Sequence, residues 1–262
     1  MSAAFKWTSD ELQDMVMSYQ RGETAQSIAK RYGTSHQVIL PLLAKQGIVL
    51  RTSKEAHKKQ TCDERYFQVI DTEEKAYWIG FLTADGCITK GKQSGDSPRV
   101  TINLGKQDYG HLVKFKQALQ ATQKISESEH SCSFTIYSTE MVKDLAMHGI
   151  LPRKTFSTKP VQIAPNLERH YWRGVIDGDG TFSKNGGEMR LYGDYDVVVS
   201  FQSFVLSHCS QVHGKILKAD NICNFMIKKQ ATHCMLEILY DNATVFLDRK
   251  FERAQKILTC SS

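Results

Sequence analysis

Two aspartates at matching places in two similar segments are the residues best suited to chemistry. Asp85 follows the apolar stretch AYWIGFLTA, Asp179 follows HYWRGVIDG, and a glycine comes directly after each aspartate. The two aspartates are 94 residues apart, the spacing expected of two copies of one unit of about a hundred residues. Carboxylates that meet in this way would bind a divalent cation such as Mg²⁺, which prefers oxygen ligands and keeps open positions for water and phosphate.

The predicted place of each aspartate, in the last turn of a helix, also indicates a cation. A carboxylate there faces the negative end of the helix dipole, which costs about 0.3–1 kcal/mol. Two such carboxylates side by side would repel each other as well, and a bound cation would relieve both effects. The alternative is that each Asp-Gly pair only begins a loop, as this pair often does in hairpins. The repetition of the whole pattern favours the metal site.

The helices expected to carry the aspartates contain paired small residues that would let them pack closely. Gly80 and Ala84 are four residues apart in the first helix, as are Gly174 and Gly178 in the second. Residues four apart lie on one face of a helix. A glycine inside a helix costs about 1 kcal/mol relative to alanine, so we expect a compensating close approach of the two helix backbones.

Capping residues predict where these helices begin and end. Asp71 is predicted to cap the first helix, with Glu74 completing a capping box. Asn166 is predicted to cap the second helix. Gly86 and Gly180 are predicted to end the two helices, as glycine commonly does at helix C-termini.

The segments WIGFLTADG and WRGVIDGDG resemble the two motifs of a single-chain, double-motif LAGLIDADG homing endonuclease. The resemblance covers about residues 62 to 262, and it is specific because the motif occurs twice at the family's spacing. At motif position six the first copy has Thr83 and the second has Asp177. At position two the second copy has Arg173, where the family has a small or apolar residue. Neither departure falls at the metal position, and the difference at position six predicts two inequivalent halves.

The resemblance implies an activity, a magnesium-dependent endonuclease that hydrolyses one phosphodiester on each DNA strand across the minor groove and leaves short 3′ overhangs. Asp85 and Asp179 would be catalytic and would bind two or three divalent ions, helped by the main-chain carbonyls of Ala84 and Gly178. Mn²⁺ would substitute for Mg²⁺. The implied partner is double-stranded DNA with a long target site, bound by a monomer.

Two lysines end the two halves in the same way. Lys154 lies in GILPRKT and Lys250 lies in FLDRKFERA, places where the resembling family carries a basic residue near the scissile phosphates. Such a charge would be catalytic, because it can stabilise developing negative charge or hold the attacking water. The alternative for either one is an ordinary solvated surface lysine.

The predicted fold class is α+β, with two pseudo-symmetric half-domains over residues 62–155 and 156–262. Each half is expected to follow the order α-β-β-α-β-β-α, and strands are predicted by alternation of apolar and polar residues. The predicted strands cover 87–90, 99–105, 131–138, 181–184, 196–203, 224–229 and 232–240.

In the resembling family the strands of both halves form a saddle along the major groove of DNA. Polar residues on the strands would then read base edges or contact phosphates. The residues predicted to do so are Arg99, Thr101, Asn103, Ser200, Gln202 and Lys228. For any single one of them, ordinary solvent exposure is the alternative.

Residues 1–50 resemble an all-α helix-turn-helix DNA-binding module. In that family the early residues of the second helix of the pair meet base edges, and here these are Ser35, His36 and Gln37. Pro41 departs from the pattern, because a proline inside a helix removes a hydrogen bond and kinks the helix. The alternative is a three-helix packing module without a ligand. The predicted helices cover 8–19, 24–32 and 35–45.

Composition fits a DNA-binding protein without identifying one. The net charge is +6, and residues 1–60 carry +4 of it (9 Lys+Arg against 5 Asp+Glu). Residues 51–61 are basic and are predicted to be a linker that follows phosphates, or else a solvated connector. The seven cysteines contain no CxxC pair, so we expect reduced cysteines in an intracellular protein.

No apolar run approaches the eighteen or so residues that span a membrane, and the N-terminal residues do not read as a signal peptide. We therefore expect a soluble intracellular protein without a membrane partner, in a prokaryotic or phage cytoplasm rather than an organelle. A cleavage-inactive DNA-binding regulator or an intron-splicing maturase on the same fold is the competing function. Both acids and both lysines of the site favour the endonuclease, because a pure binder has no use for paired carboxylates facing phosphate.

Overall fold

The structure is a computed structural model that describes most of the chain. The described residues are 7–21, 23–50, 61–90, 97–152, 159–183, 186–209, 212, 214–219 and 222–259. The chain divides into two compact units, Met1–Gln60 and Thr61–Ser262, and each has its own apolar core. Lys154 and the predicted linker residues 51–60 lie outside the described residues.

The described part of the first unit contains three short helices, which lie where the sequence predicts them. They are α1 (Ser9–Gln20), α2 (Ala25–Arg31) and α3 (His36–Lys45). Thr8 begins α1 with a capping box that includes Glu11, and Thr24 caps α2. Pro41 lies on the exposed side of α3 and does not end the helix. The apolar core is formed by Met15, Tyr19, Ala25, Ile28, Ala29, Ile39 and Leu43.

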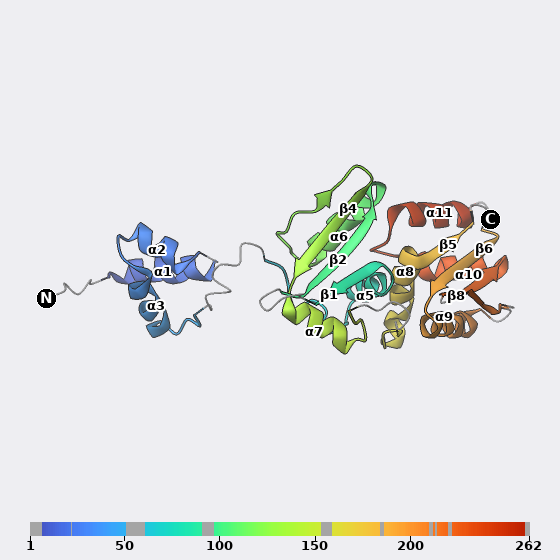
Figure 1. The fold of residues 1–262 in the computed structure, drawn as a ribbon, viewed down its shortest axis with the longest axis horizontal. Coiled ribbons are helices and arrows are strands. Elements are labelled where there is room, and N and C mark those ends of the chain that lie inside the picture. The colour runs from blue at the N-terminus through green and yellow to red at the C-terminus, as the bar shows by residue number, and fades with distance from the viewer. Residues whose placement is uncertain are drawn as a thin grey trace. The chain divides into compact units, whose positions relative to one another are not determined.

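The second unit contains two four-stranded antiparallel sheets with helices packed on them (Figure 1). The strand order is β1-β2-β4-β3 in one sheet and β5-β6-β8-β7 in the other, so corresponding strands occupy corresponding places. The strands are β1 (Gly86–Thr89), β2 (Arg99–Gly105), β3 (Ser126–Glu127), β4 (Ser131–Tyr137), β5 (Gly180–Phe182), β6 (Glu188–Gly193), β7 (Ile216–Ala219) and β8 (Ile222–Lys228). The helices are α5 (Glu73–Asp85), α6 (Tyr109–Ala118), α7 (Thr139–Met147), α8 (Glu168–Asp179), α9 (Tyr195–His208), α10 (Gln230–Tyr240) and α11 (Asp248–Thr259).

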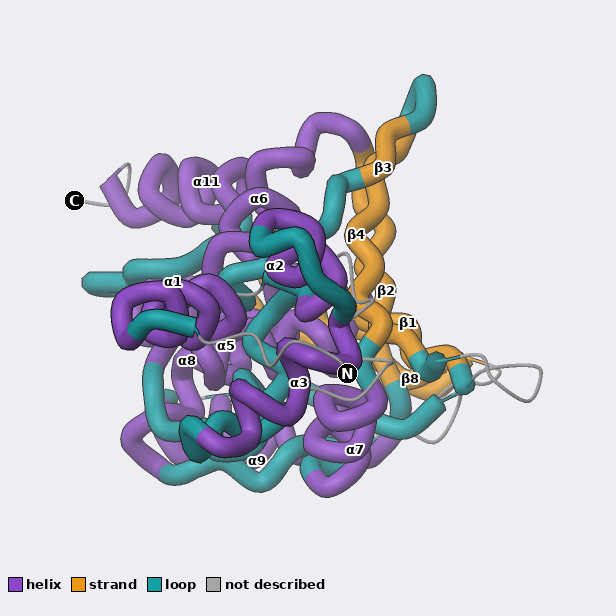
Figure 2. The backbone as a smooth tube through the Cα atoms, turned by 90° about the vertical axis from the view of Figure 1, so that its left-hand side faces the viewer, coloured by secondary structure: helices purple, strands orange, loops and turns teal. Residues whose placement is uncertain are grey.

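One face of each sheet packs against helices, and the other carries polar side chains. Along β2, Val100 and Ile102 are buried while Arg99 and Asn103 are exposed. Helix α6 packs on β2 and β4, and α9 packs on β6 and β8. Figure 2 shows β1, β2, β4 and β8 along one side of the molecule. Helices α5 and α8 lie side by side between the two sheets (Figure 1).

Helix α9 is the main correction to the predicted second half. The sequence predicts a strand over 196–203, but these residues belong to α9. A run of β-branched valines favours a strand locally, whereas the buried residues Val198, Phe201 and Val205 recur at helical spacing. The predicted strand over 232–240 is likewise part of a helix, α10. Strand β6 lies between the predicted strands 181–184 and 196–203, where the sequence analysis predicts no strand.

The predicted N-terminal caps of the two central helices are also wrong. Helix α5 is capped by Thr72, whose hydroxyl accepts a hydrogen bond from the Lys75 N–H, and Asp71 instead forms an ion pair with the Lys75 ammonium at 2.8 Å. A 3₁₀ turn over Pro165–Leu167 leads directly into α8. Asn166 lies inside that turn and does not cap the helix.

One pair of cysteines is oxidised, although the sequence analysis predicts that all of them are reduced. Cys209 after α9 and Cys234 in α10 are joined as a disulfide, so the expectation that all seven cysteines are reduced is wrong. The two are 25 residues apart in sequence, and nothing in that spacing distinguishes them from the others. Among the described residues, no helix is both long enough and apolar enough to cross a membrane.

Candidate active site

The contact between α5 and α8 is built on glycine. A Cβ atom added to Gly80 would overlap the carbonyl oxygen of Tyr171, and one added to Gly174 would overlap that of Tyr77 and lie 2.7 Å from the Phe81 nitrogen. These neighbours are backbone atoms, which cannot move aside without moving a helix. The spacing of small residues in the two motifs therefore corresponds to two helix backbones in direct contact.

The two aspartates lie at neighbouring ends of these helices. Asp85 is the last residue of α5 and Asp179 is the last residue of α8. A Cβ atom on Gly178 would overlap that of Ala84 and would lie 3.3 Å from Asp85 Oδ2. The first carboxylate thus lies against the residue that precedes the second aspartate. Asp85 is half-buried and Asp179 is exposed.

The glycines after the aspartates turn each helix directly into a strand. Gly86 and Gly180 are the C-terminal caps of α5 and α8, and their N–H groups donate to the carbonyls of Leu82 and Ile176. Both glycines have extended backbones, with φ of −73° and −86°, and they begin β1 and β5. Each aspartate is therefore fixed at a junction between a buried helix and the first strand of a sheet.

Lys250, in the first turn of α11, is buried against the C-terminus of α8. Its ammonium, which has three N–H donors, lies within hydrogen-bonding distance of four main-chain carbonyl oxygens, those of Ile176 (2.6 Å), Asp177 (2.7 Å), Gly178 (3.4 Å) and Gly180 (2.6 Å). A cation at this place supplies donors to carbonyls of the last helical turn and complements the negative end of the helix dipole.

The charges of both motif aspartates act on the pKa of the same lysine. Burial lowers the pKa of Lys250 to about 8, and the carboxylate of Asp177, followed by those of Asp85 and Asp179, opposes that shift. The ammonium therefore lies within electrostatic reach of both helix ends. Sequence analysis placed Lys250 near the reaction but gave no indication that it also caps α8.

Position six of the motif is occupied very differently in the two helices. The Asp177 carboxylate is buried and accepts hydrogen bonds from the hydroxyls of Tyr77 (2.7 Å) and Tyr240 (2.6 Å) and from the Leu247 N–H (2.7 Å). Burial raises the pKa of Asp177, against the lowering effect of nearby Lys250 and of these donors. Asp177 is a cross-link between the halves, since Tyr77 belongs to α5.

Position two of the second motif has a structural explanation too. Arg173 is fully buried, and its guanidinium pairs with the Glu73 carboxylate at 2.7 Å. It also donates to the main-chain carbonyls of Leu239 and Val245, both at 2.9 Å. The planar guanidinium can hold several such partners at once. The residue that departs from the motif thus joins the start of α5 to the chain that follows α10.

The donor set at the helix ends contains oxygen atoms only. Among the described residues there is no cluster of three or more histidine, cysteine, aspartate or glutamate side chains that could hold a metal ion. Asp85 and Asp179 would therefore supply two carboxylates, and other ligands would be main-chain oxygens, water or substrate. Such a set fits Mg²⁺, which commonly binds one or two carboxylates and keeps several waters.

Comparison with known proteins identifies the fold. No protein-family model matches the chain, and no curated protein matches it. A structure of the LAGLIDADG meganuclease I-AabMI bound to uncleaved DNA matches with a TM-score of 0.53 and 14% identity, over 71% of this chain and 89% of that chain. A structure of the LAGLIDADG homing endonuclease I-GzeII in complex with its DNA target matches with a TM-score of 0.51 and 13% identity, over 71% and 91%. The chain has the fold of LAGLIDADG endonucleases. At such low identity the likeness shows the fold and not the activity.

The predicted DNA contacts of the first half lie on the open face of its sheet. Arg99 and Asn103 are exposed on β2, and Thr101 between them is half-exposed. The Thr101 hydroxyl lies 3.0 Å from that of Thr135 on the paired strand β4. In the second half, Lys228 is exposed at the end of β8. These four residues share the strand faces that the helices do not cover.

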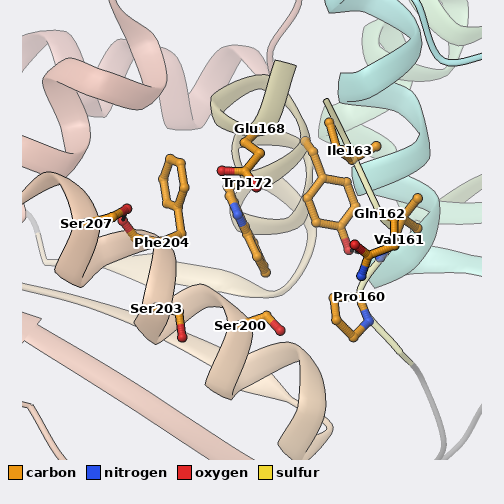
Figure 3. Close-up of a pocket in the computed structure, with 11 residues that line it drawn as sticks. Pro160, Val161, Gln162, Ile163, Glu168, Trp172, Ser200, Ser203, Phe204 and Ser207 are labelled. Atoms are coloured by element: carbon orange, nitrogen blue, oxygen red, sulfur yellow. Dashed lines mark hydrogen bonds between the residues drawn. The ribbon is translucent and has the colours of Figure 1, made fainter. Parts of the chain in front are cut away.

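The predicted placement of Ser200 and Gln202 on a DNA-facing strand is wrong. Both lie on helix α9 and not on a strand, so the alternation argument that placed them toward DNA does not hold. Figure 3 shows Ser200 and Ser203 on this helix, along a surface pocket that also includes Trp172 and Pro160. The Gln202 side chain donates to the carbonyl of Gly214. Gln202 therefore connects α9 to the segment before β7 of its own half.

The strand that sequence analysis missed carries better candidates. In β6, Met189 and Leu191 are buried, whereas Arg190 and Tyr192 point to the open face. The Arg190 guanidinium lies over the Tyr192 ring, 5.8 Å from the ring centroid. Arg190 Nε and Asn224 Oδ1 on paired strand β8 are buried atoms without a hydrogen-bond partner in the described structure. The alternation in EMRLYG could have identified this strand.

In the first unit, the residues predicted to read DNA lie at the start of α3. Ser35 is the N-terminal cap residue, and His36 and Gln37 form the first turn. All three are exposed, so the helix start is accessible within this unit.

Proposed function

We propose that the protein is a monomeric, sequence-specific double-strand DNA endonuclease. The observation that carries the proposal is the pair of aspartates at neighbouring ends of two glycine-packed helices. The shared fold with LAGLIDADG endonucleases supports it. Because Asp85 and Asp179 belong to one chain, a single protein would present one carboxylate to each strand of a duplex. Cleavage would cross the minor groove and leave short 3′ overhangs.

Asp85 and Asp179, with the main-chain carbonyls of Ala84 and Gly178, would hold divalent ions, two or three in number. Mg²⁺ would activate water and neutralise charge on the phosphate and the leaving oxygen, and Mn²⁺ would substitute for it. The carboxylates fix where the ions bind, because they are attached to a rigid helix-to-strand junction. The same junction excludes bulk water from the buried side of the site.

Lys250, and Lys154 in the first half, would contribute positive charge near the reacting phosphates. The ammonium of Lys250 lies within electrostatic reach of both motif aspartates. A fixed cation placed where negative charge develops lowers the energy of the transition state, since it needs no reorganisation during the reaction.

The open faces of the two sheets would form the DNA-binding saddle. Arg99, Thr101 and Asn103 would contact one half of a long target site, and Lys228 with Arg190 the other. Arginine donates bidentate hydrogen bonds to guanine, and Arg190 lies half-buried on the open face of β6. The first unit would add further contacts through Ser35, His36 and Gln37, in a salt-dependent way.

A second candidate is a binder on the same fold that has lost cleavage, either a regulator or a splicing maturase. The exposed start of α3 in the first unit favours it, since a module of this kind can bind DNA without cutting.

Selection from a random duplex library separates the two candidates. With Mg²⁺ or Mn²⁺, we expect cleaved duplexes that share a long sequence, and none with Ca²⁺ or chelator. The D85N variant should recover the same sequence in bound form without cutting it. Bound but uncut duplexes from the wild-type protein would favour the second candidate.

A further inference from the structure

The segment from Thr244 to Lys250 belongs to the second half but is held by the first. It connects the end of α10 to the first turn of α11. Each of its seven residues makes a hydrogen bond or ion pair with a residue outside the segment. We call these residues the clasp. Because every residue of the clasp has a partner outside it, those partners determine the position of its backbone.

Four clasp residues contact the first half directly. The Thr244 N–H donates to Glu73 Oε1 at 2.9 Å. The Lys114 ammonium of α6 donates to the Phe246 carbonyl at 3.0 Å and to the Asp248 carboxylate at 2.5 Å. The remaining contact, between Arg249 and Asp108, is the closest to Lys250 in sequence.

The Arg249 contact has the most buried acceptor side chain of the four. Arg249 Nε lies 3.0 Å from both carboxylate oxygens of Asp108, in the 3₁₀ turn before α6. The Asp108 side chain is 6% exposed, so its carboxylate has little access to water as an alternative partner. A buried carboxylate that accepts from a guanidinium holds it firmly.

Two further clasp residues reach the first half through α8. The Val245 carbonyl accepts from Arg173, which pairs with Glu73 of α5. The Leu247 N–H donates to Asp177, whose carboxylate also accepts from the Tyr77 hydroxyl of α5. Both relays end on the helix that carries Asp85.

The clasp ends at Lys250, the predicted catalytic lysine of the second half. Lys250 directly follows Arg249, and its ammonium is bound to the carbonyls at the end of α8. A shift of Arg249 would therefore shift the ammonium relative to Asp179.

We propose that the first half positions Lys250 of the second half through the clasp, with Asp108 as the positioning residue. This inference rests on the proposed endonuclease function. Cleavage of the strand served by Lys250 then depends on a carboxylate that contacts neither substrate nor metal. Since a displacement of about 1 Å can cost about a hundredfold in rate, loss of the Asp108 contact should slow one strand by about 10- to 100-fold.

The test compares the two strands of one duplex. A target recovered by selection is labelled differently on each strand and cut by the full chain in Mg²⁺ under single-turnover conditions. D108N should slow one strand and leave the other at the wild-type rate, so that nicked duplex accumulates. Affinity measured in Ca²⁺ should not change. The swapped pair D108R/R249D should restore part of the lost rate, because it remakes the contact with reversed charges.

The matched control is E140Q. Glu140 is a first-half carboxylate whose ion pairs are with Lys143 and Arg65, outside the clasp, and its loss should leave both strands unchanged. Equal slowing of both strands by D108N, or no slowing, would overturn the inference and leave the endonuclease function intact. A wild-type protein that binds the duplex and cuts neither strand would overturn the proposed function, and this inference with it.

Discussion

The two motif helices carry the same aspartate at the same place but are held by different contacts. In α5, Thr83 at position six donates its hydroxyl to the Ile79 carbonyl of its own helix. In α8, Asp177 and Arg173 are both buried and bind the chain after α10 as well as residues of α5. The end of each motif therefore fixes the carboxylate of Asp85 or Asp179, whereas positions two and six serve the packing of each half.

Substitution of the aspartates should have the largest effect on cleavage, and it tests whether the C-terminal ends of α5 and α8 are equivalent. Changing either Asp85 or Asp179 to asparagine removes a metal-binding charge at one helix end. Each change should lower the rate of double-strand cutting by about a thousandfold or more, because metal stabilisation of several kcal/mol is lost at about 1.36 kcal/mol per factor of ten. Gel assays of both strands measure this, and DNA binding should persist. A D85N protein that still cut both strands would refute the role of that carboxylate.

Substitution at motif position six should lower the unfolding free energy more in α8 than in α5. D177A would leave two tyrosine hydroxyls and the Leu247 N–H without their acceptor, and it should cost about 3–5 kcal/mol of unfolding free energy, as loss of one partner of a buried polar network does. T83V removes one hydroxyl, which bonds the Ile79 carbonyl of its own helix and the Tyr171 side chain, and should cost about 1 kcal/mol. Urea denaturation compares the two. Equal losses would contradict the inequivalence of the helices.

Glycine in the shared interface offers a third comparison. G174A would place a methyl group against the backbone of α5 and should destabilise the protein by about 1–3 kcal/mol. G110A is the matched control, because Gly110 of α6 has open space where its Cβ would lie. That change should be neutral or stabilising, by up to about 1 kcal/mol. Thermal unfolding would report both, and a harmless G174A would show that the helices are less closely packed than described.

The smallest effect concerns acid stability. Burial, followed by the charge of Lys114, lowers the pKa of His111 to about 3, so the folded protein holds this imidazole neutral. The contribution of His111 to stability is complete above its unfolded pKa of about 6.5 and is lost as pH falls toward 3. At pH 5 the loss is about 2 kcal/mol.

Substitution of His111 should isolate its contribution to the pH dependence of stability. H111Q should flatten the decline of unfolding free energy between pH 7 and pH 5, measured by urea denaturation at each pH. His130, whose side chain is 87% exposed, provides the control, and H130Q should keep the wild-type slope. An unchanged slope in H111Q would assign the acid sensitivity to other groups, such as His170, whose pKa burial lowers to about 4.

The sequence predicts the central helices and the first sheet well, because their patterns are local. RVTINLG alternates, and it forms β2 with Val100 and Ile102 buried. The second half is harder, since local preference and tertiary contact disagree. The valines of α9 favour a strand by themselves, and only their packing on β6 and β8 makes the helix the better state.

Long-range polar contacts could not be predicted at all. Tyr77 and Asp177 are 100 residues apart, and no spacing rule connects them. The same holds for Arg249 and Asp108, at a separation of 141. The sequence identified Asp177 and Arg173 as unusual for the motif, but the partners that explain them became visible only in the fold.

The central claim is that the carboxylates of Asp85 and Asp179 hold divalent ions together against the DNA backbone. Anomalous scattering from crystals of the protein with its selected duplex and Mn²⁺ tests this most directly. We expect manganese peaks within coordination distance of both carboxylates and of phosphate oxygens. Manganese bound elsewhere, or DNA bound away from these two helix ends, would contradict it.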